Sequence, residues 1–224
     1  MSEKDPMMDI SAKNLLTRIT VSKSERRLSG LAFASSLKND FDDLVELVNS
    51  KPEILNKKAG QRQGTILHRT AENNRPRFVE FLIKKGAKQT FDVYGNYPLH
   101  YACISGDKLV VEVLVREGAD LDAINFEGER PINLAAGCGN LDVVLFLINA
   151  GAKAFGCGFC GNSALHSAAE GGHLSVVTEL VELGHNVNMV NDKEETALHF
   201  AAGNGEGLKC VEFLLEEGAN VKAM

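Results

Sequence analysis

One histidine-containing motif returns along the chain at an almost constant interval, and this periodicity constrains the fold more than any other feature. His100, Asn133, His166 and His199 follow one another at intervals of 33 residues, and His68 precedes His100 by 32. The motifs read ILHRT, PLHYA, PINLA, ALHSA and ALHFA, and each is followed by an apolar pair and then by Gly-Ala or Gly-His. A period of about 20–50 residues is typical of stacked repeats, in which no unit buries its apolar face alone.

The repeated segment resembles the ankyrin repeat, whose pattern is Gly-x-Thr-Pro-Leu-His-x-Ala-Ala-x-x-Gly-His. The stretch Gly95–Ala119, GNYPLHYACISGDKLVVEVLVREGA, shows the resemblance over one unit. The resemblance implies an all-α solenoid of stacked helix–turn–helix repeats with projecting β-hairpin loops. We expect a capping segment at 1–30 and an array over 31–224, divided into a degenerate unit at 31–60 and repeats at 61–94, 95–127, 128–160, 161–193 and 194–224.

Composition and charge exclude several classes of function. The 224 residues carry a formal net charge of −6, whereas nucleic-acid binding needs a concentrated basic face. No apolar run approaches the roughly 20 residues of a membrane helix. Five cysteines at irregular spacing do not make a disulfide framework, so reduced thiols in the cytoplasm, the nucleus or a host cell into which the protein is delivered fit better. We therefore expect no nucleic-acid partner and no membrane insertion.

The recurring residues have structural explanations. Thr65, Ser163 and Thr196 place a hydroxyl where it caps a helix start, while Tyr97 and Arg130 leave two helix starts without one. One recurring position is expected to fill the core between helices: Leu67, Leu99, Ile132, Leu165 and Leu198. A second is small because adjacent helices must approach closely there: Ala71, Ala102, Ala135, Ala168 and Ala201.

The histidines are expected to be structural. By resemblance, the recurring imidazoles hydrogen-bond between turns and neighbouring repeats. A catalytic or metal site needs unlike residues to converge, whereas a constant period sets like residues in a row. Asn133 occupies the same slot, and an amide can hydrogen-bond but cannot act as a base. We therefore expect no enzyme activity, no cofactor and no metal.

Cys157 and Cys160 form the one constellation that suggests other chemistry. A CxxC pair can hold zinc or cycle as a redox pair. A closed zinc site needs two further ligands, and the matching slots of the adjacent hairpins supply no thiol or imidazole. We interpret the pair as small hairpin residues, with a metal or redox protein as the alternative.

Variable positions on the concave face are expected to bind another protein, because stacked repeats leave a long concave surface. Aromatic residues at successive hairpin tips would form an exposed ridge of interface anchors, unless each ring packs against its own hairpin. Acidic residues follow at the C-terminal end and predict a partner segment with an apolar anchor and then Lys or Arg. The expected partner-binding residues are Tyr94, Asn96, Ile104, Phe126, Glu129, Phe159, Asn162, Glu170, Asp192 and Glu195.

The sequence therefore predicts a monomeric, non-catalytic scaffold or adaptor. The alternative is the N-terminal targeting or regulatory module of a longer enzyme, channel or secreted effector. Two residues are candidate modification sites, and for the segment that holds Ser29 the alternative is a helix that only covers the end of the stack. Ser29 follows two arginines in Arg-Arg-Leu-Ser, as in a site for a basophilic kinase, and Asn188 matches, by resemblance alone, the hairpin asparagine that is hydroxylated in ankyrin repeats.

Overall fold

The computed structural model describes residues 41–154, 161–205 and 207–221. The expected capping segment at 1–30, residues 31–40 of the degenerate unit, and residues 155–160 lie outside the described residues. The helices are α2 Phe41–Ser50, the 3₁₀-helix η2 Pro52–Asn56, α3 Ile66–Glu72, α4 Pro76–Lys84, α5 Pro98–Ser105, α6 Lys108–Arg116, α7 Pro131–Gly137, α8 Leu141–Asn149, α9 Ala164–Glu170, α10 Leu174–Glu182, α11 Ala197–Gly203 and α12 Leu208–Glu216.

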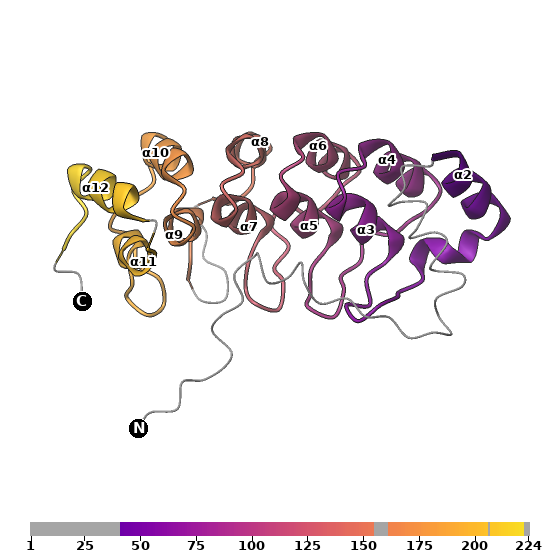
Figure 1. Cartoon of the computed structure of the whole chain (residues 1–224), viewed down its shortest axis with the longest axis horizontal. Helices are drawn as coiled ribbons and strands as arrows, with labels where there is room; N and C mark the ends of the chain where they lie inside the picture. Colours follow the sequence, from indigo (N-terminus) through magenta and orange to yellow (C-terminus); the bar gives the residue numbers. More distant parts are fainter. Residues whose placement is uncertain (1–40, 155–160, 206, 222–224) are drawn as a thin grey trace, which may run out of the picture.

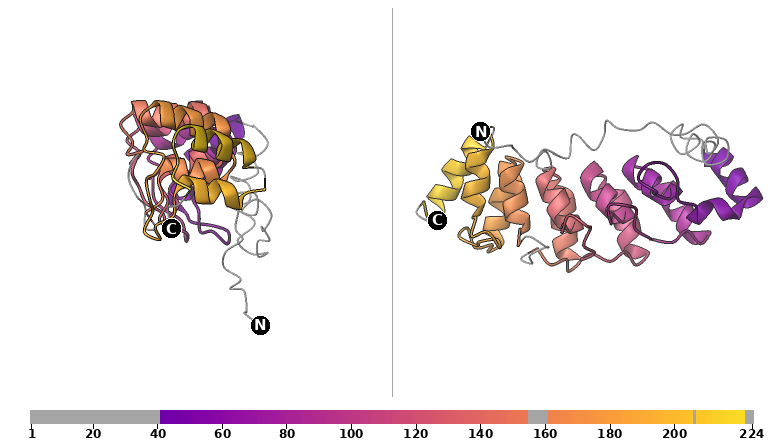
Figure 2. Two further views of the ribbon diagram at one scale, coloured as in Figure 1. Left: turned by 90° about the vertical axis from the view of Figure 1, so that its left-hand side faces the viewer. Right: turned by 90° about the horizontal axis from the view of Figure 1, so that it is seen from below.

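The helices form two parallel rows. In Figure 1, α4, α6, α8, α10 and α12 lie above α3, α5, α7, α9 and α11, and the loops that join successive repeats project below the lower row. The view along the array in Figure 2 shows the same order of upper helices, lower helices and loops. The fold is the expected all-α solenoid. Its hairpin loops contain isolated β-bridges, Ala59 with Gly64 and Val190 with Thr196, and the described residues contain no regular strand.

The predicted core positions are buried. Leu67 and Ile132 have no exposed surface, Leu99 and Leu165 are 1 % exposed, and Leu198 in the last repeat is 8 % exposed. The alanines at the small slot, Ala71, Ala102, Ala135, Ala168 and Ala201, are all fully buried. Because these positions have no exposed surface, a larger side chain there would force the surrounding helices to shift.

The first described unit differs from the later repeats. Leu44 and Val48 of α2 are buried against the array, and the chain then turns into η2 at Pro52. Proline removes a backbone donor and ends the preceding helix. At the other end of each later repeat, glycine ends the second helix, as Gly118 does with φ of 83°, a left-handed conformation that a β-carbon would strain.

No helix among the described residues is long and apolar enough to cross a membrane.

Candidate interaction surface

The recurring histidines connect each repeat to the next one. At His100, Nδ1 accepts the backbone N–H of Tyr97 at 3.1 Å, while Nε2 lies 3.3 Å from the carbonyl oxygen of Glu129 in the following repeat. A backbone N–H can only donate, so Nδ1 is unprotonated and the Nε2–H donates to the carbonyl. His68 makes the same pair of contacts, with the N–H of Thr65 and the carbonyl of Asn96. His166 makes them with the N–H of Ser163 and the carbonyl of Glu195.

This geometry requires neutral imidazoles. Burial lowers the pKa of His100 to about 4 and lowers the pKa values of His68 and His166. A proton on Nδ1 would face the backbone N–H that now donates to it. These three histidine side chains therefore have a structural role, each buried at the same position of its own repeat. The residues that the structure describes contain no group of three or more His, Cys, Asp or Glu that could hold a metal ion.

The repeat that begins at residue 128 makes fewer hydrogen bonds at the histidine position and at the helix start than its neighbours do. Asn133 donates Nδ2–H to the carbonyl oxygen of Asn162 at 2.9 Å, but its buried Oδ1 has no hydrogen-bond partner. Arg130, at the cap position of α7, makes no side-chain cap hydrogen bond, and its Nε and Nη1 are also buried without one. The helix starts in the neighbouring repeats have a histidine Nδ1 that accepts the N-cap backbone N–H, and α7 lacks this contact.

Side chains within the hairpin loops hold the tips in shape. Oδ1 of Asn125 accepts two backbone N–H groups of its own loop, and Oδ1 of Asp92 does the same. Nδ2 of Asn125 donates to Oδ1 of Asn96 at 2.9 Å. Asn96 is only 5 % exposed. Its carboxamide hydrogen-bonds to the neighbouring repeat and offers little surface to a partner.

Apolar side chains are exposed along the hairpin tips of two adjacent repeats. We call this set the hairpin ridge: Phe91, Val93, Tyr94, Ile124 and Phe126, which are between 43 and 70 % exposed. The two loops are linked by a backbone hydrogen bond of 2.9 Å from the N–H of Phe126 to the carbonyl of Tyr94. This backbone hydrogen bond therefore fixes the two halves of the ridge next to each other.

The rings of the ridge contact one another but remain exposed. Phe91 meets Phe126 edge-on at 5.8 Å and Tyr97 at 5.7 Å between ring centroids. Even so, Phe126 is 70 % exposed and Tyr94 is 44 % exposed. Packing against the array therefore covers only part of each ring. Phe159, expected on the next tip, lies outside the described residues, as do the Cys157–Cys160 pair and Ser29.

Three carboxyl groups from successive repeats repel one another in pairs, and we call them the acidic row: Glu129, Glu170 and Glu195. Burial, followed by repulsion from Glu127 and Glu170, raises the pKa of Glu129 to about 7. Burial and then repulsion from Glu195 raise the pKa of Glu170. Glu170 therefore interacts with a carboxyl group of the preceding repeat and with one of the following repeat.

The other predicted contact residues are more varied. Asp192 is exposed and Ile104 is half-buried. Asn162 is half-buried, and its Oδ1 accepts Nδ2–H of Asn191. The exposed Asn188, the expected hydroxylation site, already uses its carboxamide: Nδ2 donates to the carbonyl of Gly218 and Oδ1 accepts the N–H of Asn220.

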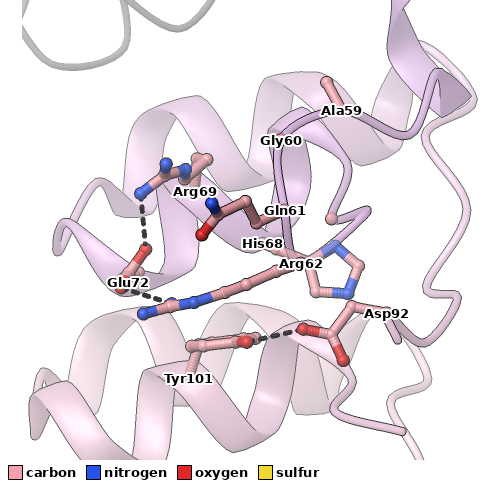
Figure 3. Close-up of a pocket in the computed structure, with 10 residues that line it drawn as sticks. Ala59, Gly60, Gln61, Arg62, His68, Arg69, Glu72, Asp92 and Tyr101 are labelled. Carbon is pink, nitrogen blue, oxygen red and sulfur yellow. Dashed lines mark hydrogen bonds and ion pairs between the residues drawn. The ribbon is translucent and has the colours of Figure 1, made fainter. Parts of the chain in front are cut away.

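A small pocket of about 30 Å³ near α3 and α5 was not foreseen from the sequence (Figure 3). Arg62 and Arg69 both pair with Glu72, at 2.9 and 3.2 Å, and the Tyr101 hydroxyl donates to Asp92 at 2.6 Å. Burial and this hydrogen bond raise the pKa of Tyr101. Each charge that lines the pocket is matched by an opposite charge or a donor, and the volume suits only one or two water molecules. We interpret this cluster as structural.

Comparison with known proteins identifies the repeat. The sequence profile described as "Ankyrin repeats (3 copies)" matches residues 31–125 and 132–224, so the chain belongs to the ankyrin-repeat family. Among solved structures it is similar to the ankyrin repeat domain of Bcl-3, described as a unique member of the IkappaB protein family. That match has a TM-score of 0.71 and 27 % identity, and it covers 86 % of this chain and 88 % of the other. A search of curated proteins gave no significant match. Ankyrin repeats generally mediate protein–protein interaction.

Proposed function

We propose that this chain is a non-catalytic protein-binding scaffold or adaptor, and that its partner lies across the hairpin ridge and the acidic row on the concave face. The single observation that carries this proposal is the exposure of Phe126, which is 70 % exposed on a tip fixed by backbone hydrogen bonds. Burying one phenylalanine side chain contributes about 1.5–3 kcal/mol. Exposed aromatic anchors with polar neighbours are typical of interface hot spots.

Charge supports a partner with basic residues. Over residues 161–224 the chain has ten Asp and Glu residues against three Lys, whereas residues 41–94 have seven acidic and ten basic residues. Glu170 and Glu195 of the acidic row lie in this negative part of the array. A partner segment with an apolar anchor on the ridge and Lys or Arg beyond it would match both features, and opposite charges would also speed its association.

A displayed library of random peptides tests this proposal, because it samples many anchors and charge patterns at once. Peptides selected on the intact chain are expected to combine an apolar anchor with Lys or Arg. Phe126→Ala is expected to weaken their binding at least tenfold, which corresponds to the loss of about 1.4 kcal/mol. Leu109→Ala supplies the matched control, because Leu109 is 59 % exposed but lies at the start of α6 in the other row of helices.

Two results would contradict the proposal. Equal losses in the Phe126 and Leu109 variants would show that the tips have no special part in binding. If the selected peptides have no basic residues and Glu170→Gln leaves their affinity unchanged, the acidic row is not part of the binding site. Circular dichroism of each variant shows that the fold is retained, so a binding loss is not a folding loss.

The remaining expectations complete the proposal. We propose that residues 31–224 form the binding array and residues 1–30 its cap, and that the protein acts as a monomer in the cytoplasm, the nucleus or a host cell. Asn188 and Ser29 stay predicted modification sites. Mass spectrometry of the protein isolated from its native source tests both, since hydroxylation and phosphorylation change peptide mass by different amounts.

A further inference from the structure

In four of the described repeats, a side chain at the end of the first helix or in the turn that follows it ties the repeat to the preceding one. In every case the side chain donates to a backbone carbonyl at the end of the preceding lower-row helix. The four contacts are Ser105 Oγ to Ala71 O at 3.4 Å, Asn140 Nδ2 to Cys103 O at 2.8 Å, His173 Nε2 to Gly137 O at 3.0 Å, and Asn204 Nδ2 to Glu170 O at 2.7 Å. Asn204 therefore joins the last described repeat to the rest of the array.

Asn204 combines this contact with an adjacent glycine on its C-terminal side. Asn204-Gly205 is the single Asn-Gly pair in the sequence. Asn204 ends α11 in an extended conformation, with φ of −95° and ψ of 124°, and Gly205 is exposed. Over the described part of the chain, the Gly205 N–H makes no hydrogen bond, and a β-carbon built on Gly205 would meet no atom within 4 Å.

These features suit an intramolecular reaction at the asparagine side chain. The backbone nitrogen of the following residue must reach the side-chain carbonyl carbon, and glycine shields that nitrogen less than any residue with a side chain. Glycine also gives the backbone the freedom to rotate into a ring. Asn140 makes the same kind of inter-repeat contact, but Leu141 follows it and begins α8.

We propose that Asn204 is a site of spontaneous deamidation. The Gly205 nitrogen attacks Cγ of Asn204, the new C–N bond closes a five-membered succinimide, and the side-chain nitrogen leaves as ammonia. Water then opens the ring at either carbonyl and yields aspartate or isoaspartate. The overall change adds one water and releases one ammonia, with no oxidation or reduction.

The reaction would remove one of the contacts that hold the last repeat, beside those of His166 and Asn188. The Nδ2–H group that donates to the Glu170 carbonyl is replaced by a carboxylate oxygen, so two acceptors would face each other. The product also adds a negative charge beside Glu170, whose own pKa is already raised by burial and by Glu195. We expect α11 and α12 to open more readily after conversion, while the repeats before them are unchanged.

The test is to incubate the purified chain in mildly alkaline buffer and follow each asparagine by peptide mass spectrometry. Tryptic cleavage after Lys193 and Lys209 yields a peptide in which Asn204 is the sole asparagine. The expected result is conversion at Asn204 severalfold faster than at Asn140 in the same sample. Gly205→Ala is expected to slow conversion severalfold with the fold intact, because its methyl group enters open space.

The consequence is measured separately. Asn204→Asp, which carries the product's charge, is expected to raise hydrogen exchange in α11 and α12 and to leave α5 and α6 as they were. Equal conversion at Asn204 and Asn140, or a Gly205→Ala variant that converts as fast as the parent, would overturn the proposal. So would an Asn204 that stays intact in the folded chain while the urea-unfolded chain converts.

Discussion

Because His68, His100 and His166 are buried in their neutral form, we predict that they lower the stability of the array on mild acidification. The contribution of a single histidine can be measured at His100. The side chain is fully buried, Nδ1 accepts a backbone N–H, and burial lowers its pKa to about 4. The unfolded chain has the ordinary histidine pKa of about 6.5. Between these two values the unfolded state binds a proton that the folded state does not, so stability falls as the pH falls from about 6.5 toward 4.

The size of the effect comes from the same two values. At about pH 5 the solution is roughly 1.5 units below the unfolded pKa and still above the folded one. One pKa unit corresponds to about 1.36 kcal/mol, so His100 alone should cost the fold about 2 kcal/mol relative to neutral pH. Glu129 acts in the opposite direction. Its pKa is raised to about 7 in the fold, so protonation below that value favours the folded state.

His100→Asn separates these contributions, because asparagine already occupies the same slot at Asn133 and does not titrate. Urea unfolding of the parent and the variant, each at neutral pH and at about pH 5, measures the free energy of unfolding. The variant is expected to be less stable than the parent at neutral pH but to lose about 2 kcal/mol less on acidification. An equal loss in both proteins would refute the assignment of a neutral, buried His100. Similar urea slopes at both pH values are needed for the comparison to hold.

Three further predictions concern the array and its surface. Asn133→His together with Arg130→Thr should restore the missing helix-cap contacts of α7 and raise the free energy of unfolding by about 1–2 kcal/mol, measured by urea unfolding; no gain would show that the neighbouring packing rejects the histidine ring. Leu165→Ala should cost about 2–5 kcal/mol, because the side chain is 1 % exposed, and a thermal midpoint unchanged from the parent would contradict its core position. Glu129→Gln should raise the thermal midpoint at about pH 8, where the buried carboxyl is ionised, and have less effect at about pH 5. A larger gain at the acidic pH would reverse the sign argued here.

The repeat pattern and most helix positions could be predicted from the sequence, because the signals are local. The 33-residue period, the prolines at the starts of α5 and α7, and the glycines after the second helices each act within one repeat. The apolar slots could be assigned because every unit must bury the same face against its neighbour. The family assignment rests on these local features.

The burial and the pKa values of the polar surface residues could not be predicted from the sequence, because they depend on contacts between residues about 30 positions apart. Asn96 looks like a free polar residue in the sequence, but the carboxamide of Asn125 in the next repeat binds it and buries it. Glu129 and Glu170 look like ordinary surface acids, yet stacking buries both carboxyl groups, and burial, followed by repulsion from neighbouring carboxyl groups, raises both pKa values.

The sequence by itself determined that this chain stacks, because its period and its small, apolar and capping residues repeat within each unit. Only the tertiary structure decided which polar side chains serve the stack and which remain for a partner. The reason is geometric: a hydrogen bond or a carboxyl repulsion between repeats depends on how closely two units approach, and that distance is set by the packing of the whole array.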